Sequence, residues 1–378
     1  MSGATENRPI KAAVVRDSGG PFRLEDATLG APHDDEVLVR IVATGMCHTD
    51  MVIRDQVYPV PLPIVLGHEG AGIVESVGAR VTKLAAGDHV VLTFVSCGAC
   101  RTCQSGVAAG CERFNALNFA GARLDGSHAL HVAADGPVND RFFGQSSFAT
   151  YAIATERNAI KVRKDAPLEL LGPLGCGVQT GAGTVLNALK VTAGSSFAAF
   201  GAGAVGLSAV MAARVAGATT IVAIDVVASR LELARELGAT HVVNSREHDA
   251  VDAVRGATGE GVDFALDSTA RAEVVAQAVA ALRARGVCAV VGASAPGTQL
   301  VADINDVMQN GKTIRGVVEG DSVPDFFIPH LVDLYMQGRF PFDRLVRYYP
   351  FDAINQAADD SEHGVTIKPI VRVGEVSG

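Results

Sequence analysis

Four of the chain's seven cysteines lie in one short segment, and their spacing indicates a metal site. The pattern is C-x2-C-x2-C-x7-C, with members Cys97, Cys100, Cys103 and Cys111. Four thiolates can close a tetrahedron around Zn²⁺ and leave no open position, so such a site stabilises a lobe and does not bind substrate. Iron–sulfur proteins begin with similar spacing, and disulfide-bonded or reactive thiols are a further alternative. Because nothing in the sequence resembles an electron-transfer partner, structural zinc is favoured.

A second, dispersed set of residues has the chemistry of an open zinc site. Its members are Cys47 in "GMCHTDMV", His68 and Glu69 in "LGHEGAG", and Cys176 in "LGCGVQTG". Taken singly, a cysteine is most often a small buried residue and a histidine a satisfied core or surface residue. Two thiolates and one imidazole together form a ligand set for catalytic zinc, of which alcohol dehydrogenase is the standard example, with a fourth position open.

A glycine-rich turn indicates nucleotide binding. "FGAGAVG" places Gly201, Gly203 and Gly206 at G-x-G-x-x-G spacing, after an apolar strand and at the start of a helix. The next strand ends at Asp225, nineteen residues after Gly206, where a carboxylate accepts hydrogen bonds from a ribose. The alternative is a tight turn without a ligand. Asp225 would repel a 2′-phosphate, which favours NAD over NADP, although Arg230 could partly accommodate one.

The helices and strands that must position these residues follow one pattern before about residue 175 and another pattern after it. Up to about residue 175, short apolar runs between Gly, Pro and Asp predict a mostly antiparallel β domain. Strands and helices then alternate, which predicts a parallel sheet covered on both faces. Expected strands include "SSFAAFGAG", "TTIVAID", "VDFALD" and "VCAVVG"; expected helices include "AVGLSAVMAARVAG", "VASRLELARELG" and "AEVVAQAVAALRARG". Cys288 is predicted to be a buried strand residue.

Length and charge limit the classes of protein and partner. A chain of 378 residues favours two domains. The net charge of -9, without a basic run, argues against nucleic acid and anionic membranes as partners and favours small molecules. We find no secretory signal and no membrane-spanning segment, and therefore expect a cytoplasmic protein. An odd number of cysteines in a reducing compartment argues against disulfides.

With "GHEGAGIVESVG", the four-cysteine lobe, "GPLGCG" and "GAGAVG" in that order, the chain resembles the zinc-dependent medium-chain alcohol dehydrogenases over essentially its whole length. The resemblance implies an α/β protein in which a GroES-like, mostly-β catalytic domain over residues 1–177 carries a structural zinc lobe at 95–113. It implies a Rossmann NAD-binding domain with a doubly wound parallel sheet over 178–319, and a C-terminal return to the catalytic domain over 320–378. It also implies a homo-oligomer, either a dimer or a tetramer.

The resemblance assigns roles to the dispersed residues. It implies that Cys47, His68 and Cys176 bind the catalytic zinc, which makes two zinc ions per chain with the four-cysteine site. Glu69 is implied as a nearby acid able to approach the metal. Asp50 matches the carboxylate that orients the ligand histidine, a role that also follows from the chemistry of metal-bound imidazole.

Proton transfer and cofactor contacts follow from the same resemblance. Thr49 matches the hydroxyl that bonds the alcohol oxygen and passes on its proton; the alternative is an ordinary turn threonine. The horse-liver-type enzymes have a relay histidine five residues after the ligand cysteine, where this chain has Val52. His48 is therefore expected either to relay protons or to contact the pyrophosphate. The remaining matches are Thr180 and Val205, against the nicotinamide, and Lys368, a pyrophosphate contact or else a solvated lysine.

A closer resemblance is to bacterial aryl-alcohol (benzyl alcohol) and geraniol dehydrogenases. It is carried by "CHTDMVIRDQVYPVPLPIVLGHEG", "FFGQSSFATYAIA", "LELLGPLGCGVQTGAG" and "GRFPFDRLV". It implies reversible oxidation of primary aryl or allylic alcohols, of the benzyl, geraniol or perillyl alcohol type, with hydride transfer to NAD⁺. Phe94 and Phe119 are candidates for an aromatic substrate pocket.

Three other functions fit the same motifs. The first is a zinc-dependent polyol or secondary-alcohol dehydrogenase on the same fold. The second is a formaldehyde-active, glutathione-linked relative, which the net charge supports little. The third is a non-catalytic NAD(P)-binding relative, which the intact set Cys47, His68 and Cys176 argues against.

Overall fold

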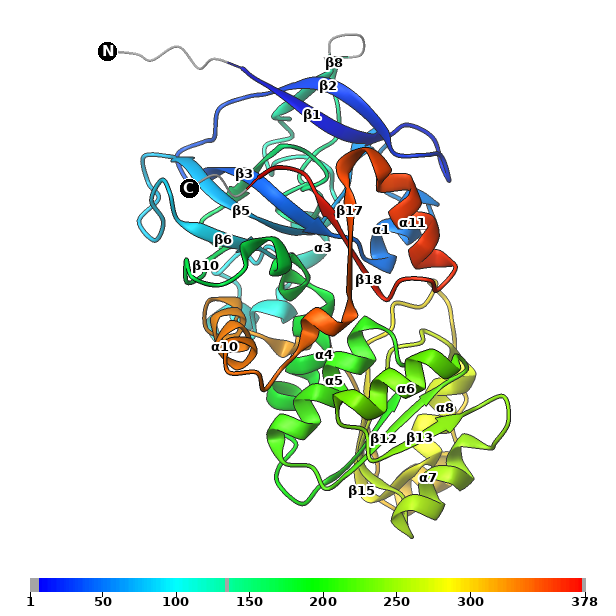
Figure 1. The fold of residues 1–378 in the computed structure, drawn as a ribbon. Helices are drawn as coiled ribbons and strands as arrows, with labels where there is room; N and C mark the ends of the chain where they lie inside the picture. The colour runs from blue at the N-terminus through cyan, green and yellow to red at the C-terminus, as the bar shows by residue number, and fades with distance from the viewer. Residues whose placement is uncertain (1–6, 133–135, 376–378) are drawn as a thin grey trace. The chain divides into compact units, whose positions relative to one another are not determined.

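The computed structural model describes residues 7–132 and 136–375 of the chain (Figure 1). These residues form two compact units. We call the first the β unit; it comprises Met1–Cys176, Val323–Met336 and Asp343–Gly378, as far as these ranges are described. The second, here called the α/β unit, comprises Gly177–Ser322 and Gln337–Phe342. Within the described residues, no helix has the length and apolar character needed to cross a membrane.

The β unit contains two mainly antiparallel sheets. The first has the strand order β4-β1-β2-β7-β8, from β1 (Arg8–Val15), β2 (Arg23–Leu29), β4 (Ile64–Val65), β7 (Leu130–Val132) and β8 (Gly136–Pro137). The second has the order β10-β6-β5-β3-β18-β17, with β9 also paired to β3. Its strands are β3 (Glu36–Gly45), β5 (Glu69–Val77), β6 (His89–Leu92), β9 (Tyr151–Thr155), β10 (Ala159–Lys161), β17 (Val346–Pro350) and β18 (Lys368–Arg372).

Strand β3 is the centre of the second sheet. Its sequence "EVLVRIVATG" is almost continuously apolar and buried, as expected for a strand covered on both faces. It pairs antiparallel with β5, Gly45 lying opposite Glu69, and with the C-terminal strand β18, Ile370 lying opposite Gly45. The end of β3 therefore meets the start of β5 and a strand from the far end of the chain.

Short helices complete the β unit. They are α1 (His48–Arg54), α2 (Arg101–Gln104), α3 (Phe114–Asn118), α10 (Pro324–Met336) and α11 (Ile354–Glu362). Helix α1 follows β3 after Met46 and Cys47, and η4 (Gly172–Gly175) packs on β5. At this contact a Cβ on Gly172 would lie 2.3 Å from the Glu69 carbonyl oxygen, so only glycine permits the approach.

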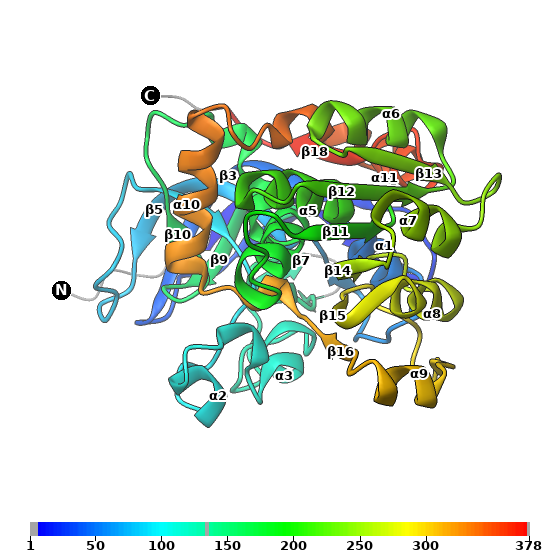
Figure 2. The same cartoon turned by 90° about the horizontal axis from the view of Figure 1, so that it is seen from below.

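The α/β unit is built on a parallel sheet with the strand order β13-β12-β11-β14-β15-β16, which can be followed in Figure 2. The strands are β11 (Ser196–Phe200), β12 (Thr220–Asp225), β13 (His241–Asn244), β14 (Val262–Asp267), β15 (Leu282–Val290) and β16 (Thr313–Gly316). The order runs outward in both directions from β11 and β14, which is the doubly wound arrangement with its switch point between these two strands. The predicted fold class is confirmed.

Helices α5 and α6 pack on each other and on β11–β13, whereas α7 and α8 pack on each other and over β12–β15. The helices of this unit are α4 (Gly177–Gly183), α5 (Ala204–Ala216), α6 (Ala228–Leu237), α7 (Ala250–Thr258), α8 (Ala272–Ala280) and α9 (Ile304–Gln309). A π-helical turn over Thr184–Ala188 follows α4. Cys288 is fully buried in β15, as predicted.

One predicted helix is too long. The sequence predicts a helix over residues 272–286, but α8 ends at Ala280 and β15 begins at Leu282. Leu282 pairs with Val262 of β14, and the Arg283 guanidinium binds the Asp263 carboxylate with Nε to Oδ1 at 2.6 Å. These contacts between distant residues override the helical propensity of the segment.

Candidate metal centres and nucleotide site

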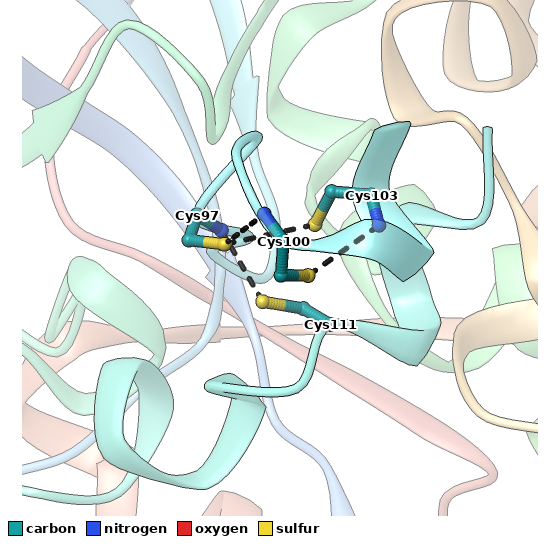
Figure 3. A group of neighbouring side chains, drawn as sticks. All are labelled: Cys97, Cys100, Cys103 and Cys111. Carbon is teal, nitrogen blue, oxygen red and sulfur yellow. Dashed lines mark hydrogen bonds between the residues drawn. The ribbon is translucent and has the colours of Figure 1, made fainter. Parts of the chain in front are cut away.

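The four cysteines of the opening segment converge on one point (Figure 3). Their Sγ atoms all lie within 4.8 Å of one another, and no disulfide joins them. Cys97 and Cys100 precede α2, Cys103 lies on it, and Cys111 follows the short turn η1 (Ala108–Gly110). Three backbone N–H groups, of Cys97, Cys100 and Cys103, donate to sulfur atoms of the group at 3.3, 3.3 and 3.5 Å.

The protonation of these thiols fits a cation site. Hydrogen bonds from the backbone N–H groups of Ala99 and Cys100 lower the pKa of Cys97 to about 6. Burial, together with the neighbouring Cys100 thiol, raises the pKa of Cys103 to about 12. Four adjacent sulfurs do not all ionise unless a cation balances their charge, and the tetrad therefore fits a tetrahedral zinc ion.

The dispersed residues also converge. Cys47, His68, Glu69 and Cys176 each offer a ligand atom, and these atoms lie within 4.8 Å of one another. Cys47 stands between β3 and α1, His68 and Glu69 stand at the start of β5, and Cys176 follows η4. The β3–β5 pairing and the packing of η4 on β5 bring the three segments together.

The carboxylate of Asp50 orients two members of this set. Asp50 is fully buried; its Oδ1 lies 2.9 Å from Nδ1 of His68 and accepts the Gly67 N–H at 3.1 Å. Its Oδ2 accepts the Cys47 N–H at 2.9 Å. One carboxylate thus fixes the start of α1, the His68 ring and the turn before β5.

The unused nitrogen of His68 is the clearest sign of a metal ligand. Nε2 is buried and has no hydrogen-bond partner among the described residues. A hydrogen bond from Cys176 and the positive charge of Lys368 hold the pKa of Cys47 well below its usual range. A bare imidazole nitrogen beside a thiolate, with the other ring nitrogen on a carboxylate, fits a bound zinc ion.

Glu69 and Lys368 form a buried ion pair beside these ligands. Nζ of Lys368 lies 2.8 and 3.0 Å from the two carboxylate oxygens of Glu69 and donates to the Met46 carbonyl at 3.2 Å. Burial opposes the charge on Lys368, but the Glu69 carboxylate raises the pKa of the ammonium. The solvated-lysine alternative is therefore wrong: Lys368 is 2% exposed.

Thr49 and His48 lie on the first turn of α1. Thr49 is half-buried, and its Oγ1 lies 3.7 Å from Sγ of Cys47. His48 is exposed, directly beside the ligand candidate Cys47. The hydroxyl of Thr49 is thus close enough to the Cys47 sulfur to meet a group bound at that sulfur.

The glycine-rich turn has the backbone geometry that a phosphate site needs. Gly201 directly follows β11 and has φ of 96°, in the left-handed region. A Cβ on Gly206 would lie 1.8 Å from the Gly201 carbonyl oxygen, so close packing of helix and strand requires glycine. Gly203 differs, because no atom lies within 4 Å of where its Cβ would be. The space beside Gly203 is free for a ligand to approach the start of α5.

The carboxylate of Asp225 lies beside this turn. Its Oδ2 accepts the Ala202 N–H at 2.7 Å, and its Oδ1 accepts the N–H groups of Val226 and Val227. A cavity of about 300 Å³ adjoins it, lined by residues that include Gly201, Gly203, Asp225, Arg230 and Arg271. Nε of Arg230 has no partner among the described residues. The cavity and the turn together fit a dinucleotide's adenosine half.

The other predicted cofactor residues also lie in the α/β unit. Thr180 is on α4, which packs on α5; a Cβ on Gly181 would lie 2.1 Å from the Val205 carbonyl oxygen. Oγ1 of Thr180 lies 3.4 Å from a carboxylate oxygen of Glu319. Sequence reasoning missed Glu319, which is buried with φ of 48°, an unfavourable backbone conformation for a residue with a side chain.

Phe94 and Phe119 belong to an aromatic cluster in the β unit. Phe119 contacts Phe142 and Phe143 with ring centroids 6.0 and 5.2 Å apart, and Phe94 joins through Phe114 at 5.8 Å. The His68 ring stacks on Phe143 at 4.6 Å. The cluster therefore reaches the ligand set. Sequence reasoning missed Phe142, Phe143 and the adjoining Gln145, for which the run "FFGQSSF" offers no ligand spacing.

Comparison with known proteins identifies the family. The family model of the alcohol dehydrogenase GroES-like domain matches residues 33–164, and that of the zinc-binding dehydrogenases matches residues 204–334. Geraniol dehydrogenase of Castellaniella defragrans is 48% identical over 363 residues, covering 96% of this chain and 97% of the relative. The chain belongs to the zinc-dependent medium-chain alcohol dehydrogenases and is an oxidoreductase.

Two solved structures are similar to this chain over almost its whole length and support the same family. Benzyl alcohol dehydrogenase from Acinetobacter calcoaceticus is 57% identical, with a TM-score of 0.94, covering 97% of this chain and 99% of that one. An alcohol dehydrogenase zinc-binding domain protein from Burkholderia ambifaria is 63% identical, with a TM-score of 0.96 and the same coverage.

Proposed function

We propose that the enzyme oxidises primary aryl or allylic alcohols to aldehydes: R-CH2OH and NAD⁺ give R-CHO, NADH and a proton. The observation that carries the proposal is the convergence of Cys47, His68 and Cys176 with the bare Nε2 of His68. The relatives named geraniol dehydrogenase and benzyl alcohol dehydrogenase support this substrate class. The aromatic cluster that reaches His68 suits a flat, apolar substrate.

We assign the catalytic zinc to Cys47, His68 and Cys176. A zinc ion held there would supply a Lewis acid that makes the alcohol hydroxyl easier to deprotonate. The structural zinc is assigned to Cys97, Cys100, Cys103 and Cys111. Metal analysis of the purified chain should then give about two zinc ions per chain.

The protein's own residues orient groups and move the proton. Asp50 fixes the His68 tautomer through the contact to Nδ1, which leaves Nε2 for the metal. Thr49 accepts the proton of the alcohol at Oγ1 and passes it on. His48, exposed on the same turn, is the relay to solvent or the pyrophosphate contact. Glu69, held by Lys368, is the acid beside the metal.

We assign NAD as the nucleotide and place its binding site on the α/β unit. Gly201, Gly203 and Gly206 would receive the pyrophosphate, and Asp225 the adenosine ribose. Arg230 lines the same cavity. Thr180 and Val205 would lie against the nicotinamide. Lys368 is expected to contact the pyrophosphate, but its ammonium group is bonded to Glu69. Binding experiments with NAD⁺ would test whether it also contacts the cofactor.

A substrate panel tests the proposal. NADH or NADPH formation is measured with benzyl alcohol, geraniol, ethanol and sorbitol, each with NAD⁺ and NADP⁺. Benzyl alcohol or geraniol with NAD⁺ should give the highest kcat/KM. Preference for sorbitol would establish the polyol dehydrogenase instead, preference for ethanol would contradict the aryl or allylic assignment, and no turnover would favour the non-catalytic reading.

We further propose a cytoplasmic homo-oligomer, a dimer or tetramer. Strand β16 lies at the end of the parallel sheet, and nearby apolar side chains are exposed: Val301 and Ile304 by 82% and Met308 by 67%. A free strand edge beside apolar side chains fits pairing with a second copy. Light scattering with Ile304→Glu and Val301→Glu should show a smaller species than the wild type; an unchanged mass would place the contact elsewhere. No disulfide joins the described cysteines, which suits a reducing compartment.

A further inference from the structure

The segment Arg141–Phe148, "RFFGQSSF", has an unusual backbone and lies against the His68 strand. Arg141, Phe143 and Ser146 have φ of 70°, 49° and 51°, and Gly144 between them has 64°. Every residue of the segment is buried. Residues with side chains keep such dihedrals only where their surroundings hold them, and they concentrate at functional sites.

Side-chain and backbone donors of this segment bind four successive carbonyl groups before and at His68. Ser146 Oγ donates to the Val65 carbonyl at 2.6 Å. The backbone N–H groups of Phe148 and Ser147 donate to the carbonyls of Leu66 and Gly67 at 3.0 and 2.9 Å. The fourth carbonyl, that of His68 itself, is bound by the side chain of Gln145.

The Gln145 carboxamide replaces strand pairing beside His68. Strands β5 and β6 pair at Ala71 and Val91, so the same register would bring residue 69 opposite Thr93. At that place Nε2 of Gln145 donates to the His68 carbonyl at 2.9 Å and to the Thr93 carbonyl at 3.2 Å, and Oε1 accepts the Gly70 N–H at 3.1 Å. One side chain thus bonds the backbone on both sides of Glu69 and links this start of β5 to Thr93, the residue that follows β6.

The ring of His68 is held by the same segment. Phe143 stacks on the imidazole with an interplanar angle of 27°, and Phe142 meets it edge-on at 5.4 Å. Nδ1 is fixed by Asp50. The backbone, one face, one edge and one nitrogen of His68 are therefore all restrained, and Nε2 is the atom that these contacts leave to point toward Cys47 and Cys176.

We propose that Gln145 is a positioning residue for the metal ligand His68, and that the segment Arg141–Phe148 sets the direction of Nε2. This inference rests on the zinc role proposed for His68. Gln145 acts through the backbone at His68 and Gly70, to which its carboxamide is bonded. Groups that orient zinc-bound histidines typically change metal affinity by about 10- to 100-fold when they are replaced.

The test is zinc release from the purified enzyme with Gln145→Met, which keeps the length of the side chain and removes its amide. A chromogenic chelator follows release in two phases, one for each site. We expect one zinc per chain to leave at least about 10-fold faster than in the wild type, and the other at an unchanged rate. Cobalt substituted at the catalytic site should show shifted d–d absorption bands.

The control is Ser147→Ala in the same segment. Ser147 Oγ pairs with Thr44 Oγ1 at 2.8 Å, both residues are buried, and none of its side-chain hydrogen bonds reaches His68. This variant should lose thermal stability without a change in either zinc phase or in the cobalt spectrum. If Gln145→Met behaves in the same way, Gln145 is only structural and the proposal is wrong.

Two further outcomes are decided by the same assay. If Gln145→Met does not fold, Gln145→Asn keeps a shorter amide that does not span both strands, and a folded Asn variant with unchanged zinc release contradicts the proposal. A wild-type chain that holds zinc at the four cysteines alone contradicts the proposed function itself. That result is seen before any variant is compared, so the two failures are distinguishable.

Discussion

At the scale of single residues, the two candidate metal centres and the glycine turn differ in the contacts that hold them. The four cysteines depend on nearby backbone N–H groups, whereas Cys47 and His68 depend on one shared carboxylate, that of Asp50. The two glycines Gly203 and Gly206 also differ in their surroundings. Gly206 is required by packing within the protein, and Gly203 faces free space. Single substitutions can therefore separate folding from binding.

Asp50→Asn should weaken zinc at the catalytic site and spare the four-cysteine site. An amide nitrogen has no lone pair for the Cys47 N–H, and a neutral side chain supports the zinc-bound imidazole less well. We expect a loss of about 10- to 100-fold in zinc affinity, measured by metal content after dialysis against graded chelator. Asp55→Asn, at the exposed end of α1, is the control and should keep both ions.

The glycine turn offers a matched pair of variants. Gly203→Ala should fold with the wild-type melting temperature but bind NAD⁺ at least about 10-fold more weakly, because its methyl group occupies the approach to the pyrophosphate. Gly206→Ala should lower the melting temperature, because its Cβ meets the Gly201 carbonyl. Calorimetric titration and thermal unfolding check the two results; tight NAD⁺ binding by Gly203→Ala would contradict the assigned turn.

At the scale of elements, a buried ionic cluster joins the start of β3 to the loops beyond α3. Arg123 donates to both carboxylate oxygens of Glu36 at 2.9 Å, and Arg141 lies 3.3 Å from Oε1. Burial raises the pKa of Glu36, but the hydrogen bond from Arg123 and the charge of Arg141 outweigh it, so the net shift is downward. Because Arg141 begins the segment that holds His68, this cluster also supports the site.

Glu36→Gln should destabilise the enzyme by about 3 kcal/mol at pH 7, since it leaves two buried guanidinium groups without their carboxylate. A lowered folded-state pKa means that the stabilisation is present above the unfolded value of about 4.3 and is lost as pH falls through the folded value. Urea unfolding at pH 7 and near pH 4 should show the difference from wild type shrinking in acid. A difference independent of pH would exclude the ion pair as its source.

At the scale of the whole molecule, the β unit is completed by the end of the chain. Strand β18 pairs with β3, and its first residue, Lys368, neutralises Glu69, the residue after His68. About three hundred residues separate the partners, including the whole α/β unit. The site in the β unit is therefore complete only after the C-terminal strand is in place.

Lys368→Met should destabilise the β unit by about 3–5 kcal/mol, because it leaves the Glu69 carboxylate buried without its cation. Glu69→Gln in the same chain should recover much of that loss, since the amide carries no charge to bury. Denaturant unfolding of the wild type, both single variants and the double variant measures the coupling. Additive effects would show that the pair contributes no interaction energy.

The sequence by itself determined the features that depend on residues close to one another along the chain. The four-cysteine lobe, the glycine turn before α5, and the alternation of strands and helices beyond residue 175 were all predicted, because ligand spacing and periodicity are local properties. Its motif order also carried the family resemblance. The same local reasoning extended α8 too far, because helical propensity over residues 272–286 takes no account of strand pairing.

Only the tertiary structure decided how residues distant in sequence act together. The resemblance had grouped Cys47, His68 and Cys176, and the tertiary structure shows that strand pairing brings them to one point. It also joins Lys368 to Glu69 and places the strained segment Arg141–Phe148 against the His68 strand. These relations arise from strand register and from packing that holds unfavourable backbone dihedrals, and both are set by contacts between distant segments. In the sequence, "FFGQSSF" contributed only to the family resemblance; in the structure, the segment restrains the residue on which the proposed chemistry depends.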